Sequence, residues 1–285
     1  MPDEHDSSET RVAHRPTKRL GQNFLKNPQV INRIIEALNP KPDETVIEIG
    51  PGTGALTAYL IERAGRVIAV EFDRSLAPLL RERFAEHDNL RVLQEDALQT
   101  DFCLEILPAQ TARLVANLPY NISTAILQRL IAQRRCLLEM ILMLQREVVE
   151  RMLAPAGSSE RGYLSVLVEA YCETEKLFDV APGSFSPRPK VWSSVVRLRF
   201  RELLAFDSEN EGLLWSIVSA GFMQKRKTIL NNLRSATGSL QDLIRRNGGA
   251  SIVLCRAGVE LQRRAETLSI EEWVRIARAM SEPLN

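Results

Sequence analysis

The chain has 285 residues, of which 45% are apolar and 26% are charged, and its formal net charge is +1. These values are ordinary for a globular protein, and the balanced charge points to no particular partner. The first ten residues are polar and acidic, so we expect no secretory signal peptide. The longest apolar stretch, around residues 137–144, is too short to span a bilayer. The four cysteines form no Cys-x-x-Cys pair, so we expect a cytoplasmic protein with neither a metal site nor a disulfide.

The first 200 residues alternate between strand and helix patterns. Residues 1–16 are rich in charge and serine and predict a disordered tail. A helix is predicted from Pro28, with Asn27 as its N-cap. Strand patterns then follow at Thr45–Ile49, Val67–Phe72, Leu90–Gln94, Arg113–Ala116 and Met140–Leu144, with helix patterns between them, including Ala55–Arg63 and Leu76–Glu86. This alternation predicts a mostly parallel, Rossmann-like α/β sheet with helices on both faces.

The strand patterns end near residue 200. Two runs with alternating apolar residues, Lys176–Val180 and Val195–Phe200, predict an antiparallel hairpin at the edge of the sheet. Helices are predicted after them at Leu213–Phe222, Ile229–Leu233, Leu240–Arg245 and Ile270–Met280, the last opened by a capping box of Ser269 and Glu272. We therefore expect one α/β domain over residues 17–203 and a small all-helical domain over residues 204–285.

A glycine-rich loop, residues 48–54, follows the first strand of the predicted sheet. Its glycines at positions 50, 52 and 54 let the backbone approach a ligand closely. Glu71 ends the second strand, where a carboxylate can accept hydrogen bonds from ribose hydroxyls. The loop therefore predicts a nucleotide-like ligand, but with Ala55 it also fits the dinucleotide fingerprint G-x-G-x-x-A. These residues alone leave the class of ligand open.

Polar residues also close the third and fourth strands, at the same edge of the sheet. Asp96 follows the third strand and suits an adenine amino group, although it could also simply cap the next segment. The fourth strand ends in Asn117-Leu118-Pro119-Tyr120. The Asn117 amide and the Leu118 carbonyl are two acceptors for an amino group, Pro119 stiffens the backbone, and Tyr120 offers a face on which a base can stack. This set fits methyl transfer to nitrogen and has no role in hydride transfer.

Taken in order, these motifs resemble the ribosomal RNA adenine N6-dimethyltransferases. The residues that carry the resemblance are 21–25, 48–54, Glu71, Asp96, Asn117–Tyr120, Phe185–Val191, Gln224–Thr228 and Arg264–Ser269. The chain is most similar to the bacterial small-subunit enzymes, which dimethylate two adjacent adenines near the 3′ end of 16S rRNA. The resemblance runs from about Thr17 to Ser281. The leader before Arg15 has no counterpart in the family pattern, and Trp192 replaces a small polar residue, usually Asp.

The resemblance implies a class I methyltransferase sheet, S-adenosylmethionine as the methyl donor and no metal, and we expect the protein to be a monomer. It implies that the methyl donor contacts Gln22, Asn23, Leu25, Gly50, Gly52, Glu71, Asp96, Ala97 and Asn117. The catalytic residues would be Asn117, Leu118, Pro119, Tyr120 and Phe185, which would surround the target adenine. Phe185 has a simpler alternative role, because a phenylalanine at the start of a proline-rich loop can be a core anchor. The expected partner is 16S rRNA in the small ribosomal subunit or its precursor, with no membrane.

A basic region lies in the predicted helical domain. From Gly221 to Arg264 the chain has nine Lys or Arg residues and only two acidic ones. We expect Lys225–Lys227 to open a helix there. A solvated helix face is one explanation, but phosphate contact is the better one beside an RNA-modifying site. We therefore assign RNA binding to Lys225, Arg226, Lys227, Arg234, Arg263 and Arg264.

Three other functions remain open at this stage. A large-subunit (23S) rRNA adenine N6-methyltransferase would share the methyl-donor site, but the C-terminal motifs favour the small-subunit enzyme. A non-catalytic ribosome-assembly or transcription factor could keep the fold, but intact Glu71, Asp96 and Asn117 argue against lost catalysis. An NAD-dependent oxidoreductase would fit the glycine loop alone, and the chain offers no evident acid or base for hydride transfer.

Overall fold

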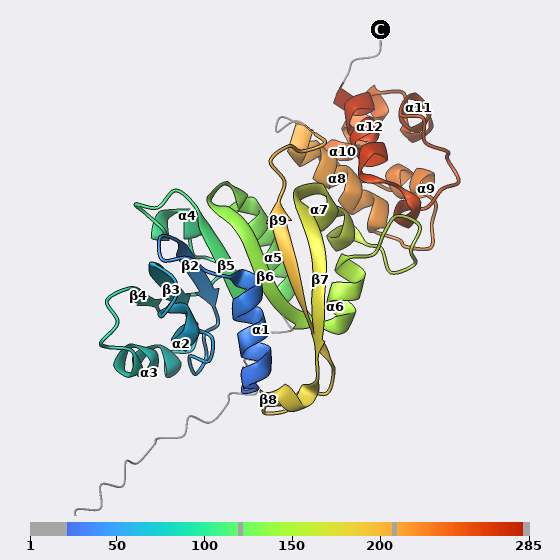
Figure 1. Cartoon of the computed structure of the whole chain (residues 1–285). Coiled ribbons are helices and arrows are strands. Elements are labelled where there is room, and N and C mark those ends of the chain that lie inside the picture. The colour runs from blue at the N-terminus through green and yellow to red at the C-terminus, as the bar shows by residue number, and fades with distance from the viewer. Residues whose placement is uncertain (1–21, 119–121, 207–209, 282–285) are drawn as a thin grey trace, which may run out of the picture.

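The computed structural model describes residues 22–118, 122–206 and 210–281. Its main sheet has the strand order β4-β3-β2-β5-β6-β9-β7 (Figure 1). The parallel strands are β2 (Thr45–Ile49), β3 (Arg66–Val70), β4 (Leu90–Leu93), β5 (Ala112–Asn117) and β6 (Leu137–Gln145). The last two strands, β9 (Ser193–Phe200) and β7 (Cys172–Val180), run antiparallel. The predicted α/β sheet and its antiparallel edge hairpin are confirmed.

Helices cover both faces of the sheet. One apolar cluster joins it to α1 (Pro28–Leu38), α2 (Thr57–Leu60) and α3 (Leu76–Arg83). A second cluster joins the other face to α4 (Phe102–Glu105), α5 (Ser123–Ala132), α6 (Arg146–Met152) and α7 (Tyr163–Tyr171). Neighbours on one strand belong to different clusters, as Val46 and Ile47 on β2 do. The reason is that successive side chains of a strand point to opposite faces.

A short strand pair attaches the N-terminal segment to the sheet. Asn27 caps α1 as predicted, because its Oδ1 accepts a hydrogen bond from the Gln29 amide at 3.0 Å. Just before the cap, β1 (Phe24–Leu25) pairs antiparallel with β8 (Phe185–Ser186). Strands of two residues show no alternation, so the sequence analysis did not predict them. Their pairing fixes residues 22–25 beside the carboxyl ends of the parallel strands.

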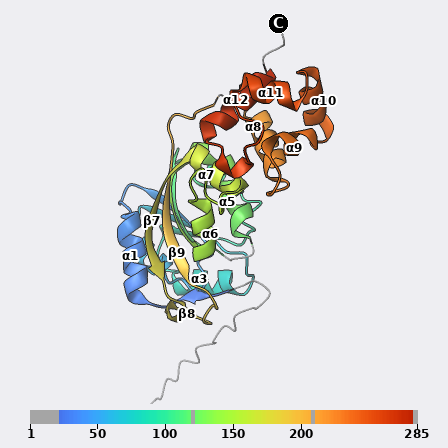
Figure 2. The same cartoon turned by 90° about the vertical axis from the view of Figure 1, so that its right-hand side faces the viewer.

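Among the residues described after β9, the regular elements are all helices, apart from an isolated β-bridge. They are α8 (Glu211–Phe222), α9 (Ile229–Arg234), α10 (Gly238–Arg246), α11 (Ala250–Arg256) and α12 (Ile270–Ser281). The capping box of α12 is confirmed, with hydrogen bonds of 2.9 and 3.3 Å between Ser269 and Glu272. The boundary expected near residue 204 falls between β9 and α8. In both views of the molecule these helices and β8 lie at opposite ends of the sheet (Figures 1 and 2).

Polar and aromatic contacts join the helices to the sheet. The Tyr171 hydroxyl donates to the Glu211 carboxylate and accepts from the Trp215 indole at 2.7 Å. Arg134, just before β6, forms a 2.9 Å ion pair with the same Glu211. One apolar cluster runs through both parts without a break. Among the helices described, none is long and apolar enough to cross a membrane.

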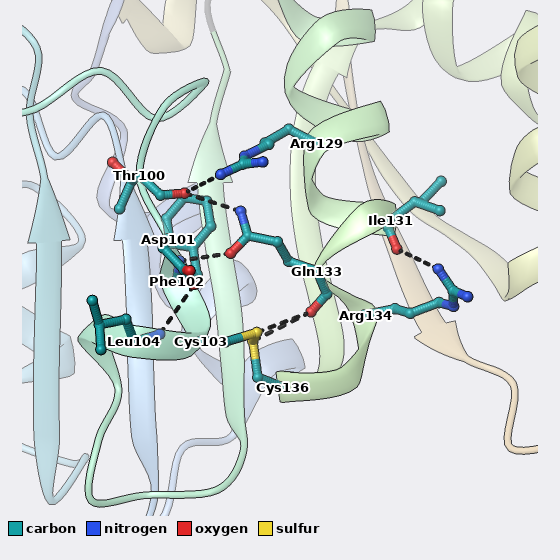
Figure 3. The surroundings of a disulfide bond; sticks show 10 residues. All are labelled: Thr100, Asp101, Phe102, Cys103, Leu104, Arg129, Ile131, Gln133, Arg134 and Cys136. Atoms are coloured by element: carbon teal, nitrogen blue, oxygen red, sulfur yellow. Dashed lines mark hydrogen bonds between the residues drawn. A yellow bond between two sulfur atoms is a disulfide. The ribbon is translucent and has the colours of Figure 1, made fainter.

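The expectation of no disulfide is wrong for one pair of cysteines. Cys103 and Cys136 are bonded, although 33 positions separate them in the sequence (Figure 3). Cys103 lies on α4 and Cys136 in a short 3₁₀ helix before β6, and the fold brings these two segments together. Sequence spacing shows only local pairs, so it could not reveal this one. Cys172 and Cys255 are free.

Candidate active site

A cavity of about 290 Å³ opens where the parallel strands end. Its walls come from β1 and from the segments that follow β2, β3, β4 and β5, which meet at one edge of the sheet as predicted. The lining includes every residue expected to contact the methyl donor, namely Gln22, Asn23, Leu25, Gly50, Gly52, Glu71, Asp96, Ala97 and Asn117. Segments from five places in the sequence thus form one concave site.

The glycine-rich loop forms the floor of this cavity. Gly50 and Gly52 have φ angles of 70° and 60°, a left-handed conformation that side chains other than glycine rarely adopt. A Cβ atom at position 52 would also lie 2.8 Å from the Phe24 ring of β1. The Gly52 amide donates a 3.0 Å hydrogen bond to the Glu71 carboxylate. The loop therefore keeps backbone, and no side chain, against the cavity at these two positions.

The Glu71 carboxylate is held in place by backbone amides. Besides Gly52, the Asp73 amide donates to it at 2.8 Å, and Asp73 in turn accepts from the Gln22 side chain at 2.7 Å. Glu71 is only 6% exposed. Burial raises its pKa, and the hydrogen bonds from Asp73 and Gly52 oppose that rise. The result is an oriented acceptor at the end of β3, facing the cavity.

Glu48 is a second buried carboxyl in the lining, and no role was predicted for it from the sequence. It is 2% exposed and accepts a 2.6 Å hydrogen bond from the Thr57 hydroxyl. Burial, with a smaller contribution from the nearby Glu71 charge, raises the Glu48 pKa from 4.5 to about 7. Near neutral pH this group is therefore close to half protonated. A cation bound in the cavity would favour its charged form.

Glu48 should make the free energy of unfolding depend on pH. Its folded-state pKa lies above its unfolded value, so the unfolded chain releases this proton first as pH rises. The resulting stability is present below about pH 4.5 and is lost as pH rises to about 7. In Glu48→Gln the loss disappears, so the variant should gain about 2–3 kcal/mol over the parent between pH 5 and pH 8. Urea unfolding of both proteins at pH 5 and pH 8 measures the free energy of unfolding of the variant relative to that of the parent. If this relative stability is the same at both pH values, Glu48 does not have a raised pKa.

Asp96 lies at the cavity and also caps a turn. Its Oδ1 accepts from the Leu98 amide at 2.9 Å, and no α-helix begins there, so its local role is to fix a tight turn. The loop that follows is tied to the end of α5. Gln133 accepts from the Phe102 amide at 2.7 Å and donates to the Thr100 carbonyl at 3.0 Å (Figure 3). Asp96 is thus both a turn residue and an oriented acceptor at the cavity wall.

The fourth strand delivers Asn117 and Leu118 to the cavity. The Asn117 amide nitrogen donates a 3.1 Å hydrogen bond to the Asn23 carbonyl, which joins the N-terminal segment to the end of β5. The Leu118 amide donates to the Met143 carbonyl at 3.2 Å, so it extends the pairing of β5 with β6 by one residue. Both residues line the cavity. The predicted catalytic residues Pro119 and Tyr120 lie outside the described residues, as do the tail and Gly21.

Two phenylalanines differ from what the sequence predicts. Phe185 does not line the cavity: it is 4% exposed and belongs to an apolar cluster with Leu25 and α1. Its pairing with Leu25 in the β1–β8 ladder directs it into the core, which supports the role of core anchor. Phe72, by contrast, lines the cavity and is 59% exposed. From the sequence, Phe72 was predicted only as the end of a strand. An aromatic residue next to the ribose-binding candidate Glu71 could have indicated contact with a bound nucleoside.

The basic segment Lys225–Lys227 is exposed, but it does not open a helix. It forms a turn between α8 and α9, and α9 begins at Ile229 with Thr228 as its N-cap. The Thr228 hydroxyl accepts a hydrogen bond from the Asn231 amide at 3.3 Å, which makes Thr228 the N-cap. Because an N-cap residue stands immediately before the first helical residue, the helix cannot include Lys225–Lys227. The prediction placed the helix start a few residues too early for this reason.

The other predicted RNA-binding residues fall into two groups. Arg264 is exposed and pairs with Thr228 in an isolated bridge, which places it beside the basic turn. Arg234 is exposed at the end of α9. Arg263 is instead engaged within the protein, in an ion pair with Glu272 and hydrogen bonds to Thr267. It therefore stabilises the start of α12 and is poorly placed to hold a phosphate.

Comparison with known proteins agrees with this geometry. The chain is 40% identical over 268 residues to the ribosomal RNA small subunit methyltransferase A of Hahella chejuensis, covering 93% of each chain. It is 41% identical to the protein of that name from Legionella pneumophila strain Lens, covering 95% of this chain and all of the relative.

Two solved structures share the fold over most of their length. A dimethyladenosine transferase from Plasmodium falciparum has a TM-score of 0.75 at 28% identity, covering 89% of this chain and 95% of that one. The 23S rRNA methyltransferase ErmE has a TM-score of 0.66 at 27% identity, covering 91% and 100%. The sequence model of the ribosomal RNA adenine dimethylases matches residues 13–280. This chain therefore belongs to the ribosomal RNA adenine dimethylase family.

Proposed function

We propose that this protein transfers methyl groups from S-adenosylmethionine to N6 of two adjacent adenines near the 3′ end of 16S rRNA, giving N6,N6-dimethyladenosine late in small-subunit assembly. The observation that carries the proposal is the placement of Asn117 and Leu118 at the wall of a cavity whose other walls hold Glu71 and Asp96. An acceptor pair for an amine thus lies beside a site for a nucleoside. The small subunit is favoured over the large because relatives of 40% identity carry the small-subunit name.

The cavity residues fit S-adenosylmethionine. The fixed Glu71 carboxylate suits the ribose hydroxyls, Asp96 suits the adenine amino group, and the exposed Phe72 ring offers the adenine an apolar face. The glycine floor at positions 50 and 52 leaves room for the rest of the molecule. When bound, S-adenosylmethionine would supply a methyl group on a positively charged sulfur. The Glu48 carboxylate beneath would balance part of that charge.

The chemistry expected of the chain itself is positioning. The N6 lone pair of adenine is delocalised into the ring, which makes the amine a poor nucleophile. Because the Asn117 amide nitrogen is engaged by Asn23, its oxygen is the atom left to accept a proton of that amine. The Leu118 carbonyl would accept the second proton, and together they would localise the lone pair toward the methyl group. Alignment of the reacting atoms supplies much of the remaining rate. No strong base is needed, because the methylated nitrogen becomes acidic once it is charged.

The chain that follows β6 connects the catalytic edge with the helical part. From the catalytic edge, α6 (Arg146–Met152) leads to a loop in which the Gly157 amide donates to the Glu266 carbonyl at 2.8 Å. Glu266 lies two residues from Arg264 and therefore close to the basic turn Lys225–Lys227. This arrangement supports residues 204–285 as an RNA-binding domain that holds the ribosomal particle while the adenine reaches the cavity. The enzyme would act as a cytoplasmic monomer.

Removing the basic turn should weaken binding to small subunits. Each cation that neutralises a phosphate releases counterions, so affinity falls steeply with salt. The triple change Lys225→Ala, Arg226→Ala, Lys227→Ala should lower the slope of log affinity against log salt by roughly 2, with S-adenosylmethionine affinity unchanged. A matched control changes Lys41, Arg63 and Arg81, which are exposed residues of the α/β part before β2, before β3 and on α3. Equal slopes for the triple variant and the parent would place the RNA contact elsewhere.

Methyl transfer to ribosomal particles tests the proposed function. Immature small subunits and, in parallel, large subunits are incubated with the protein and S-adenosylmethionine labelled in its methyl group. Label should enter the small-subunit RNA only. Label in the large subunit would support the 23S methyltransferase instead, and stable binding without transfer would support a non-catalytic assembly factor.

A further inference from the structure

Trp192 is an exposed aromatic side chain that the reaction described so far does not use. Its exposed fraction is 45%, whereas Trp273 is completely buried and Trp215 is half-buried. Exposed apolar side chains that group together mark an interaction site more often than a single one does. Val191 beside it is also exposed, at 43%. The two form a small apolar projection at the end of the loop that leads into β9.

This projection lies at the catalytic edge of the sheet. Met143 on β6 accepts from the Leu118 amide and pairs with Val195 on β9. Three residues after Met143, at the first residue of α6, the Arg146 amide donates to the Trp192 carbonyl at 2.9 Å. Because β6 lies between β5 and β9 and neighbouring strands are about 4.8 Å apart, Trp192 lies two strands across from Leu118, roughly 10 Å away at the same edge. That separation is of the order of one or two nucleotides of a single strand whose target base occupies the cavity.

Basic side chains lie against the ring and on the loop that carries it. The Arg146 guanidinium lies over Trp192 with 5.9 Å between its central carbon and the ring centroid, within the range of a cation–π contact. It also lies 3.6 Å from the Glu150 carboxylate. Arg188 and Lys190 on the same loop are exposed and have no acidic partner among the residues described. A cation thus covers one face of the ring, and two further exposed cations lie on the same loop.

We propose that Trp192 is a positioning residue on which a base next to the target adenine stacks. The inference rests on the proposed function, because its occupant is the RNA that enters the catalytic cavity. Single-stranded RNA is bound in this way by aromatic faces with cations beside them, since every base has a face to stack and phosphates follow the cations. Arg146 fixes the ring from one side, and Arg188 and Lys190 hold the flanking phosphates. The platform sets how the strand enters the site and takes no part in the transfer of the methyl group.

Steady-state kinetics on small-subunit particles test this role. In Trp192→Ala the KM for particles should rise about five- to 150-fold, the range for one lost stack, while the KM for S-adenosylmethionine stays the same. Trp192→Phe keeps a stacking face and should restore most of the loss. Leu138→Ala is the matched control, because Leu138 is 52% exposed at the opposite end of β6, and it should behave like the parent. If Trp192→Ala has the same KM for particles as the parent, Trp192 is not a stacking platform. That result would not affect the proposed function.

Photocrosslinking separates failure of the platform from failure of the proposed function. A p-benzoylphenylalanine placed at position 192 should crosslink to RNA at a nucleotide adjacent to the methylated adenines, as mapped by primer extension. If the parent does not methylate small subunits, the proposed function is wrong. The crosslink still shows independently whether position 192 contacts RNA. A crosslink only to ribosomal protein, or no crosslink, would show that the ring is a protein contact or a bare surface, and overturns the proposal.

Discussion

Replacement of Asn117 by alanine is expected to lower the maximal turnover roughly 10²–10³-fold, the usual cost of removing one hydrogen bond that acts on the transition state. The affinity for S-adenosylmethionine should fall much less, because the cavity keeps its other walls. The side-chain nitrogen of Asn117 donates a hydrogen bond to the Asn23 carbonyl. Its side-chain oxygen is therefore the atom that can accept a hydrogen bond from the substrate amine. Turnover measured at saturation, with calorimetric titration of S-adenosylmethionine, separates the two effects.

The variant Asn117→Asp is a useful companion. It keeps an oxygen acceptor but loses the amide that donates to Asn23, so the anchoring of the N-terminal segment is tested separately from acceptance of the amine. Thermal unfolding of both variants controls for loss of folding. Equal losses of turnover and methyl-donor affinity would make Asn117 a binding residue only, and unchanged turnover would place the acceptor site elsewhere.

Removal of the Glu71 carboxylate should weaken S-adenosylmethionine by roughly 1.5–3 kcal/mol, the range for hydrogen bonds to a charged group. The ribose hydroxyls would lose their acceptor, and the Gly52 and Asp73 amides would lose theirs. Because S-adenosylhomocysteine has the same ribose, its affinity for Glu71→Ala should fall by the same factor. Isothermal titration with both compounds measures this.

Glu95→Ala is the control for Glu71→Ala, since Glu95 lines the same cavity but is exposed and bonds Thr100. Its effect on methyl-donor affinity should be much smaller. Unchanged affinity in a folded Glu71→Ala protein would remove Glu71 from the methyl-donor site. Tighter binding of NADH than of S-adenosylmethionine would contradict the class of cofactor altogether.

The sequence predicted the central sheet well because strands buried on both faces form continuous apolar runs. The bounds of β2 agree with the prediction residue by residue, and β5 and β6 differ only at their ends. Helix α7 was not predicted. It is buried almost all round, so its apolar residues show no helical period that would distinguish it from a strand. Helix α11 has only seven residues and follows a glycine pair, which hides it for a different reason.

The candidate site was predictable where one polar residue ends one parallel strand. Glu71, Asp96 and Asn117 meet at the cavity because the fold places those strand ends together. Contacts between distant segments were not predictable. The burial of Phe185 depends on the β1–β8 pair, and the bond between Cys103 and Cys136 depends on how α4 packs beside the end of α5. Glu48 was overlooked because its unusual pKa arises from burial, which no single residue of the sequence reveals.

This protein is expected to make N6,N6-dimethyladenosine in the RNA of the small subunit. The most direct test is mass spectrometry of nuclease-digested RNA from small subunits that lack this modification, after incubation with the protein and S-adenosylmethionine. We predict dimethylated adenine in one fragment near the 3′ end of 16S rRNA, and none with the Asn117→Ala protein in the same time. Methylation at another base or position, or an equal yield from Asn117→Ala, would contradict the account.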